Sequence, residues 1–369
     1  MIPTHRPCVG EAELAAVGRV FASRWLGMGE VTKAFEERLR EFLGAKHVIA
    51  VNTGTAALHV ALAGLGVGPG DEVIVPSLTF ISSAQAIVAV GARPLFCEVS
   101  PDTLNIDVAD AIARATPRTR AIMPVHYGGL VCDMDTLLPL ARERKLSVLE
   151  DAAHAFGSTY KGRRVGTLGD ITCFSFDPVK NITCGGGGAV ATDNDGLAQR
   201  ILPRRNVGMH SDSWSRLQHE RNWYYEVVAP GYRYHLADLN AAIGLEQLKR
   251  AEVFKARKQA IVRRYDEAFR DVTGVRLLRH DCAETFPFSY VVRVLDDRRD
   301  ALMRHLRERG IGSSVEFIPN HLHPLFAGTS VRLPVTEQLY QEILTLPLYV
   351  ELADADVEHV IASVRGFLA

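Results

Sequence analysis

One lysine lies in surroundings that could give it unusual chemistry. Lys180 follows Pro178, which ends an apolar, strand-like run starting at Ile171, and it precedes four consecutive glycines at 185–188. A lysine removed from water has its ammonium form disfavoured and becomes a usable amine nucleophile. Lys180 is therefore a candidate to form an imine with a carbonyl cofactor. On this stretch alone, a surface lysine in a glycine-rich hairpin is the more common outcome.

A second candidate site is the turn N-T-G-T at 52–55, between an apolar strand at 47–51 and a helix predicted over 56–65. The free amides at the start of a helix bind phosphate, and threonine hydroxyls add donors. Thr53 or Thr55 could instead serve only as an N-cap. The turn lacks the pattern G-x-x-x-x-G-K-[ST], so a nucleotide P-loop is not supported.

Three further side chains follow predicted strands directly. Phe80 comes after the strand at 73–76, and Asp151 and His154 follow the strand at 147–150. Phe80 could form a flat wall for a ring, although spacing alone favours a core aromatic. In open α/β sheets a ligand lies beyond the carboxyl ends of the strands. We therefore expect one site formed by Thr55, Phe80, Asp151, His154 and Lys180.

The elements that must position these residues alternate between strand and helix up to about residue 250. This alternation predicts an α/β fold with a mostly parallel sheet. Segment 206–230 is aromatic-bearing and long for a loop, so we expect it to be functional or interfacial. Beyond 250 the pattern changes to strands at 290–295 and 312–317 and helices at 299–309, 337–344 and 354–367. We predict a large domain over 1–249 and a smaller α+β domain over 250–369.

Composition narrows the classes of function. The chain has 369 residues, 47% of them hydrophobic, and a net charge of −1, so it lacks the charge of a nucleic-acid or anionic-membrane binder. No apolar run approaches the ~20 residues of a membrane helix, and we find no signal peptide. The six cysteines are far apart, which indicates reduced thiols in a cytoplasmic protein. H-L-H at 321–323 has no third metal ligand nearby, so we predict no metal site and favour a substrate-side or packing role.

Taken together, six ordered motifs resemble the DegT/StrS family of sugar aminotransferases, which use pyridoxal 5′-phosphate (PLP). The resemblance covers essentially the whole chain, and the order of the motifs makes it far more specific than any one of them. The motifs are N-T-G-T-A-A-L (52–58), G-D-E-V-I-V-P-S-L-T-F (70–80), E-D-A-A-H-A-F-G (150–157), S-F-D-P-V-K-N-I-T (175–183), G-Y-R-Y-H-L-A-D-L-N-A-A-I-G (231–244) and L-P-L-Y (346–349).

The resemblance implies the PLP-dependent transferase fold of type I, as in aspartate aminotransferase, and a role for each matching residue. Lys180 matches the lysine that forms the imine with PLP. Asp151 matches the acid that pairs with the pyridine nitrogen and keeps the ring protonated. Phe80 matches the aromatic residue that stacks on the ring, and His154 matches a residue beside the phenolic oxygen.

The resemblance also implies how the cofactor phosphate is held. Thr55, the Ala56 amide and Ser175 match the phosphate cradle at a helix N-terminus. Arg233 matches a residue that reaches the phosphate from the neighbouring subunit, which implies a homodimer with shared active sites. The chain departs from the family pattern at Asp177, at Gly186 and at His235, whose role the pattern leaves open; none of these changes removes a reactive group.

The expected activity is transfer of an amino group from an amino acid, by resemblance L-glutamate, to the C4 keto group of a nucleotide-linked sugar. The runs V-H-Y-G-G, E-D-A-A-H and K-N-I-T-C are most similar to enzymes of the UDP-4-amino-4-deoxy-L-arabinose aminotransferase type. Such amino sugars serve cell-surface polysaccharides, including lipopolysaccharide, or glycosylated metabolites. The alternatives are a cyclitol or non-nucleotide keto sugar as substrate, or a non-catalytic sensor on the same fold. A dehydratase branch has His at the lysine position, so Lys180 argues against it.

Overall fold

The structure is a computed structural model that describes residues 1–209, 214, 223–329 and 331–368. Its main feature is a seven-stranded sheet in the order β1-β9-β8-β5-β4-β2-β3. β9 is antiparallel to both of its neighbours, and every other pair in the sheet is parallel, which confirms the predicted mostly parallel α/β sheet. The strands are β1 (His47–Val51), β2 (Glu72–Pro76), β3 (Arg93–Cys97), β4 (Thr119–Ile122), β5 (Ser147–Asp151), β8 (Ile171–Ser175) and β9 (Gly188–Thr192).

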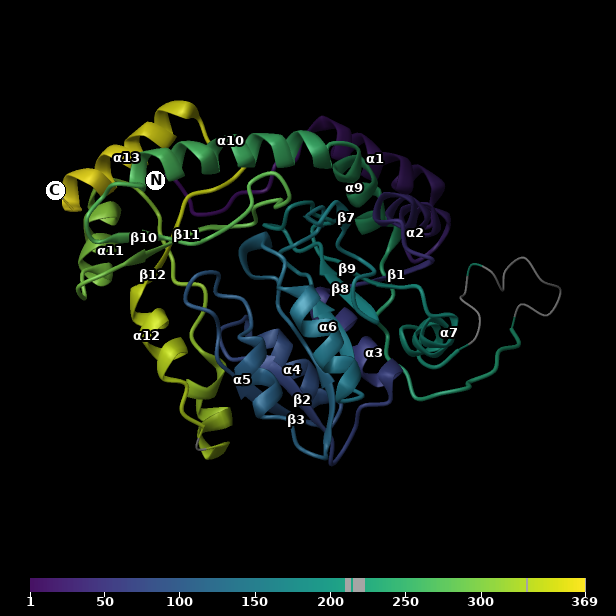
Figure 1. The fold of residues 1–369 in the computed structure, drawn as a ribbon. Helices are drawn as coiled ribbons and strands as arrows, with labels where there is room; N and C mark the ends of the chain where they lie inside the picture. Colours follow the sequence, from purple (N-terminus) through teal and green to yellow (C-terminus); the bar gives the residue numbers. More distant parts are fainter. Residues whose placement is uncertain (210–213, 215–222, 330, 369) are drawn as a thin grey trace.

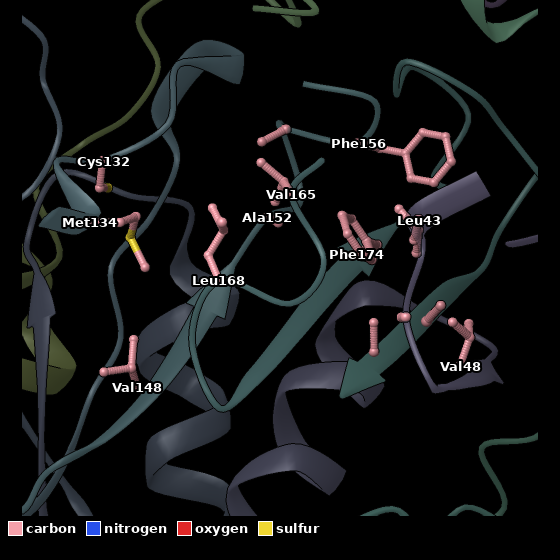
Figure 2. Packing of buried hydrophobic residues seen from close by; sticks show 14 of the residues in the cluster. Leu43, Val48, Cys132, Met134, Val148, Ala152, Phe156, Val165, Leu168 and Phe174 are labelled. Atoms are coloured by element: carbon pink, nitrogen blue, oxygen red, sulfur yellow. The ribbon is translucent and has the colours of Figure 1, made fainter. Parts of the chain in front are cut away.

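Helices pack their apolar faces against both sides of this sheet, and the strands are therefore buried on both faces. Along β1, Val48 and Ala50 pack into one apolar cluster, while Ile49 and Val51 pack into another on the opposite face. Figure 2 shows part of the first cluster, including Phe156. The first cluster receives α2 (Glu30–Leu43), α5 (Val108–Ala113) and α6 (Met134–Glu143); the second receives α3 (Gly54–Leu65), α4 (Ile81–Ala89) and α7 (Asp195–Arg204).

A second, smaller sheet is built entirely from residues beyond 250. It is antiparallel, in the order β10 (Val275–Leu277), β11 (Tyr290–Val294) and β12 (Ile343–Leu346). It shares an apolar cluster with α10 (Ala251–Phe269), α11 (Arg299–Glu308) and α13 (Asp354–Leu368). α10 follows α9 (Asp238–Lys249) and runs along the top of Figure 1 toward α13. The division at residue 250 remains a prediction.

The remaining elements are short or connect the two sheets. α12 (Pro334–Glu342) and the 3-10 helix Pro324–Thr329 bring Phe326 and Leu333 back into a cluster of the large sheet. α1 (Glu11–Ser23) packs against α9 through Ala16, Val20 and Ala242. Two further 3-10 helices, Tyr127–Gly129 and Asn320–Leu322, and a small hairpin, β6 (Thr159–Tyr160) with β7 (Arg163–Arg164), complete the fold. Within the described part of the chain, no helix is long and apolar enough for a membrane span.

Two local predictions were wrong. Segment 312–317 is not a strand and makes only the single bridge between Ser314 and Thr345. The end of the helix predicted over 337–344 is instead part of β12, because the run I-L-T-L pairs with β11, a contact that local pattern does not reveal. His321 lies in the 3-10 helix Asn320–Leu322, and His323 follows it.

Two other predictions concern segment 206–230 and the cysteines. Residues 210–213 and 215–222 of that segment lie outside the described residues, so its predicted functional or interfacial role stays a prediction. All six cysteines are free, and four of them are buried.

The four glycines at 185–188, the last of which begins β9, differ in how much the structure requires glycine at each position. Gly185 has φ +72°, in the left-handed region that glycine adopts without strain. Gly188 lies against the turn after β1, so that a Cβ built on it would be 2.5 Å from the Thr53 carbonyl oxygen. A Cβ on Gly186 would have no described atom within 4 Å. Gly188 therefore permits a close approach of β9 to the 52–55 turn.

Gly188→Ala should destabilise the protein because the new methyl group must displace backbone rather than a flexible side chain. We expect a loss of about 1–3 kcal/mol in the free energy of unfolding, measured by urea denaturation. The matched control is Gly186→Ala in the same glycine run, which should stay within about 0.5 kcal/mol of wild type. Equal effects of the two variants would contradict this account.

Candidate active site

The carboxyl ends of the parallel strands open into a cavity of about 350 Å³. Turns after β1, β2, β5 and β8 form one side of it, and residues from near the N-terminus and from the C-terminal third form the other. Most of the predicted site residues line this cavity, namely Thr55, Phe80, Asp151, His154, Ser175 and Lys180. The position of the cavity agrees with the rule for ligand sites in open α/β sheets.

Lys180 lies in the loop between β8 and β9, and its amine is held against an aromatic ring. Its Nζ lies 4.2 Å from the centroid of the Phe288 ring. Burial lowers the pKa of the Lys180 amine, and the carboxylates of Glu316, Asp151 and Asp177 offset only part of this effect. The free-base amine is the nucleophilic form, so the site favours the chemistry predicted for this lysine.

Asp151 is the last residue of β5 and is 5% exposed. Its Oδ2 accepts a hydrogen bond from the Ser83 hydroxyl at 2.7 Å, and its Oδ1 accepts one from the Ala153 amide at 3.2 Å. Burial raises the pKa of the Asp151 carboxyl, while these donors and Lys180 act in the opposite direction. A buried carboxylate of this kind is stabilised further by any cationic group that enters the cavity.

His154 forms part of an aromatic wall together with residues that sequence reasoning did not identify. Its ring stacks on Phe288, with centroids 4.1 Å apart, and lies 5.8 Å from Phe317. Burial, followed by the charge of Lys180, lowers the pKa of His154 well below its usual value, so its ring is neutral at pH 7. Its Nδ1 is buried and has no hydrogen-bond partner among the described residues. Phe80 is 53% exposed and lies 5.6 Å from Phe317.

The turn at 52–55 lines the cavity through Thr53, Gly54 and Thr55. Thr53, not Thr55, is the N-cap of α3, and its hydroxyl accepts the Ala56 amide at 3.0 Å. An anion would therefore have to share or displace the Ala56 donor that was predicted for phosphate. Thr55 donates to the Ser82 hydroxyl at 2.8 Å. A Cβ on Gly54 would lie 2.7 Å from the Ser175 Cβ, so only glycine lets this turn approach β8.

The side of the cavity opposite the large sheet was not found from the sequence. His5 Nε2 lies 2.7 Å from Glu316 Oε1, and His5 also stacks on Phe288, with ring centroids 5.0 Å apart. Glu316 Oε2 is buried without a hydrogen-bond partner in the described part of the chain. These residues carry no local motif, and only the tertiary fold brings them to the cavity. Ser83 could have been suspected, because it lies one turn after Phe80 in a helix that opens at the cavity.

Three residues named in the sequence analysis are not among the described residues that line this cavity. Arg233 is exposed and is not among the described residues that line it, so its predicted contact with the cofactor phosphate of a neighbouring subunit stays a prediction. His321 has a packing role, because its Nδ1 is hydrogen-bonded to the Ser77 hydroxyl at 2.7 Å and its Nε2 lies 3.3 Å from Glu337. Burial lowers the pKa of His235, and its Nδ1 has no described partner.

The residues present fit a cofactor that carries a carbonyl, a pyridine-like ring and a phosphate. Lys180 supplies the amine, Asp151 a buried carboxylate, and His154 a buried nitrogen with an unused hydrogen-bonding site. The N-terminus of α3, approached closely because of Gly54 and Gly188, favours an anion. The volume of the cavity lies within the range of small-molecule sites.

Comparisons with known proteins agree with this fit. Residues 7–365 match the model of the DegT/DnrJ/EryC1/StrS aminotransferase family. The chain is 42% identical to the spore coat polysaccharide biosynthesis protein SpsC of Bacillus subtilis, over 100% of this chain and 97% of that protein.

Two solved structures are similar over nearly the whole chain. The aminotransferase TlmJ of Streptoalloteichus hindustanus is 40% identical with a TM-score of 0.93, covering 99% of this chain and 98% of that one. The putative sugar aminotransferase Spr1654 of Streptococcus pneumoniae, solved in a PLP form, is 30% identical with a TM-score of 0.92, covering 99% and 98%. The chain therefore belongs to the DegT/DnrJ/EryC1/StrS aminotransferase family.

Proposed function

We propose that this PLP-dependent aminotransferase moves an amino group from an amino acid, L-glutamate by family resemblance, to the C4 keto group of a nucleotide-linked sugar. The observation that carries the aminotransfer is the convergence of Lys180 and Asp151 in one cavity, with the amine desolvated and the carboxylate held by Ser83. When bound, PLP supplies an electron-accepting ring that stabilises a carbanion at the amino-acid α-carbon. The other steps depend on the protein's own residues.

Each residue has a physical task in this proposal. Lys180 holds the cofactor covalently and, as a free amine, carries a proton to and from the reacting carbon. Asp151 keeps the pyridine nitrogen protonated, because a buried carboxylate is best stabilised by an adjacent cation. Thr55, Ser175 and the first turn of α3 would hold the phosphate, and Phe80 would cover the ring. His154, which is neutral and has an unused Nδ1, would serve the phenolic oxygen.

The sugar specificity rests on the relatives and on sequence pattern. SpsC carries a polysaccharide-biosynthesis name and Spr1654 a sugar-aminotransferase title, which supports a sugar substrate and a role in polysaccharide synthesis here. Position C4 rests on the form E-D-A-A-H, in which His154 stands where relatives that aminate C3 commonly have Gln. Among the family's subtypes, we propose that the enzyme is of the UDP-4-amino-4-deoxy-L-arabinose aminotransferase type. The alternative is a cyclitol or a sugar without a nucleotide.

The reaction assay should combine purified protein, PLP and glutamate with nucleotide-linked 4-keto sugars, 3-keto sugars and keto cyclitols. We expect a 4-amino sugar by mass spectrometry and NMR, and no product from the Lys180→Ala control. Borohydride should fix the cofactor to a peptide that contains Lys180. A label on another lysine would end that assignment. A 3-amino product with 4-keto sugars ignored would overturn the proposed position, and activity on cyclitols alone would overturn the sugar class.

Asp151→Asn tests the role of the buried carboxylate, because the amide preserves its shape and removes its charge. Loss of a charge-assisted contact costs on the order of 1.5–3 kcal/mol, so turnover should fall about ten-fold or more. The thermal unfolding midpoint should stay near that of wild type, which separates this effect from misfolding. A near-wild-type turnover would show that something else protonates the ring.

Arg233 is proposed to reach the cofactor phosphate of a partner subunit, because the 52–55 turn and Ser175 offer only neutral donors and a helix dipole. Arg233→Ala should weaken PLP binding about ten-fold or more, measured by equilibrium titration. Mixing inactive Lys180→Ala with Arg233→Ala protein should restore some activity, since mixed dimers then contain one site with both residues intact. If mixed dimers form and stay inactive, the shared-site proposal is wrong.

A further inference from the structure

A second buried lysine lies next to the loop that carries Lys180. Lys258, on α10, is 4% exposed, and its Nζ donates to the Asn181 Oδ1 at 3.1 Å and to the Phe288 carbonyl at 3.3 Å. Its Nζ also lies 5.8 Å from the centroid of the Phe288 ring, which the Lys180 Nζ approaches to 4.2 Å. A fully buried lysine is rare unless its amine is paired, and no carboxylate hydrogen-bonds to this one among the described residues.

Asn181 extends the contact of Lys258 to three segments of the active site. It directly follows Lys180 and is 5% exposed. Its amide nitrogen lies 3.0 Å from the Phe286 carbonyl and 3.4 Å from those of His154 and Phe156. The hydrogen bonds of Asn181 therefore join the Lys180 loop, the loop after β5 and the segment that supplies Phe288.

We propose that Lys258 is a positioning residue that acts through Asn181 to hold the Lys180 amine in place and keep it in its free-base form. This inference rests on the proposed role of Lys180. Without Lys258, the Asn181 Oδ1 and the Phe288 carbonyl would be buried acceptors that have lost a donor, which is unfavourable. The loop would then reorganise, and the amine would move with it.

Electrostatics supports the same arrangement. Burial, and then the charge of Lys180, lower the pKa of Lys258 to about 7, against the opposing effect of Glu316. The two amines thus share a site that disfavours two positive charges at once. Once Lys180 has given up its charge, Lys258 takes up a proton more readily. A protonated Lys258 then opposes reprotonation of Lys180, which keeps that amine reactive.

The test compares Lys258→Gln with a matched control on the same helix. Lys255 also bonds to backbone carbonyls across the two parts of the protein, those of Gly157 at 3.3 Å and Glu284 at 3.2 Å, and burial lowers its pKa too. It does not line the cavity that contains Lys180 and makes no described hydrogen bond to Asn181. Lys255→Gln should therefore reproduce the loss of stability without affecting Lys180.

The readout is the pH dependence of the rate at which full-length protein, stripped of PLP, is covalently reloaded. Reloading requires the neutral Lys180 amine, so Lys258→Gln should move the pH midpoint of the rate upward by about one unit, and kcat should fall with KM little changed. Lys258→Arg, which keeps the charge and the donors, should restore the wild-type midpoint. Lys255→Gln should leave the midpoint where it is.

Two outcomes would overturn the proposal. One is a Lys258→Gln midpoint equal to that of wild type and of Lys255→Gln. The other is a wild-type kcat in Asn181→Ala, a variant that removes the hydrogen bond between Lys258 and Asn181 but keeps both lysines. This second variant tests the positioning role even if Lys258→Gln does not fold. Borohydride mapping separates failure of the Lys258 proposal from failure of the proposed function. A label on a residue other than Lys180 rejects the assignment of Lys180. A label on Lys180 together with an unchanged pH midpoint in Lys258→Gln rejects only the role of Lys258.

Discussion

The partial removal of the Lys180 amine from water is the constraint on which the site depends. Burial lowers the pKa of this amine, while three carboxylates near it act in the opposite direction. If the amine stayed protonated, it could pair with a buried carboxylate. An amine in such an ion pair is not a nucleophile. Because Asp151 already accepts hydrogen bonds from Ser83 and the Ala153 amide, it does not need the lysine as a partner. The cavity thus holds the Asp151 carboxyl and the Lys180 amine without a need for the two groups to pair with each other.

The partial removal of this amine from water requires walls from both parts of the fold. The large sheet supplies the reactive side chains at the ends of its strands, whereas Phe288, Phe317 and Glu316 come from the C-terminal third and His5 from near the N-terminus. Lys258 and Asn181 link these contributions through buried hydrogen bonds. The chemistry of one lysine therefore depends on the relative position of segments that are more than a hundred residues apart.

The sequence was most informative for site residues that lie at or just after the end of a strand. Thr55, Asp151, Ser175 and Lys180 each follow or end a strand, and parallel strands bring their carboxyl ends to one edge, so their meeting could be predicted. Glu316 and Lys258 could not be found in this way. They reach the site through long-range packing, and no local period marks them. β12 was missed for the same reason, since its pairing with β11 overrides a helix-like pattern.

The antiparallel strand β9 fixes the distance between two parts of the site. Gly188 pairs with Val51 on one side and with Ser175 on the other, so one rung of the sheet joins the end of β1, the start of β9 and the end of β8. The last residues of β1 and β8, Val51 and Ser175, are therefore two strand spacings apart, about 9.5 Å. This separation is set by backbone hydrogen bonds and not by side chains. Substitutions around the cavity can therefore change which substrate is accepted while the distance between these two strand ends stays constant.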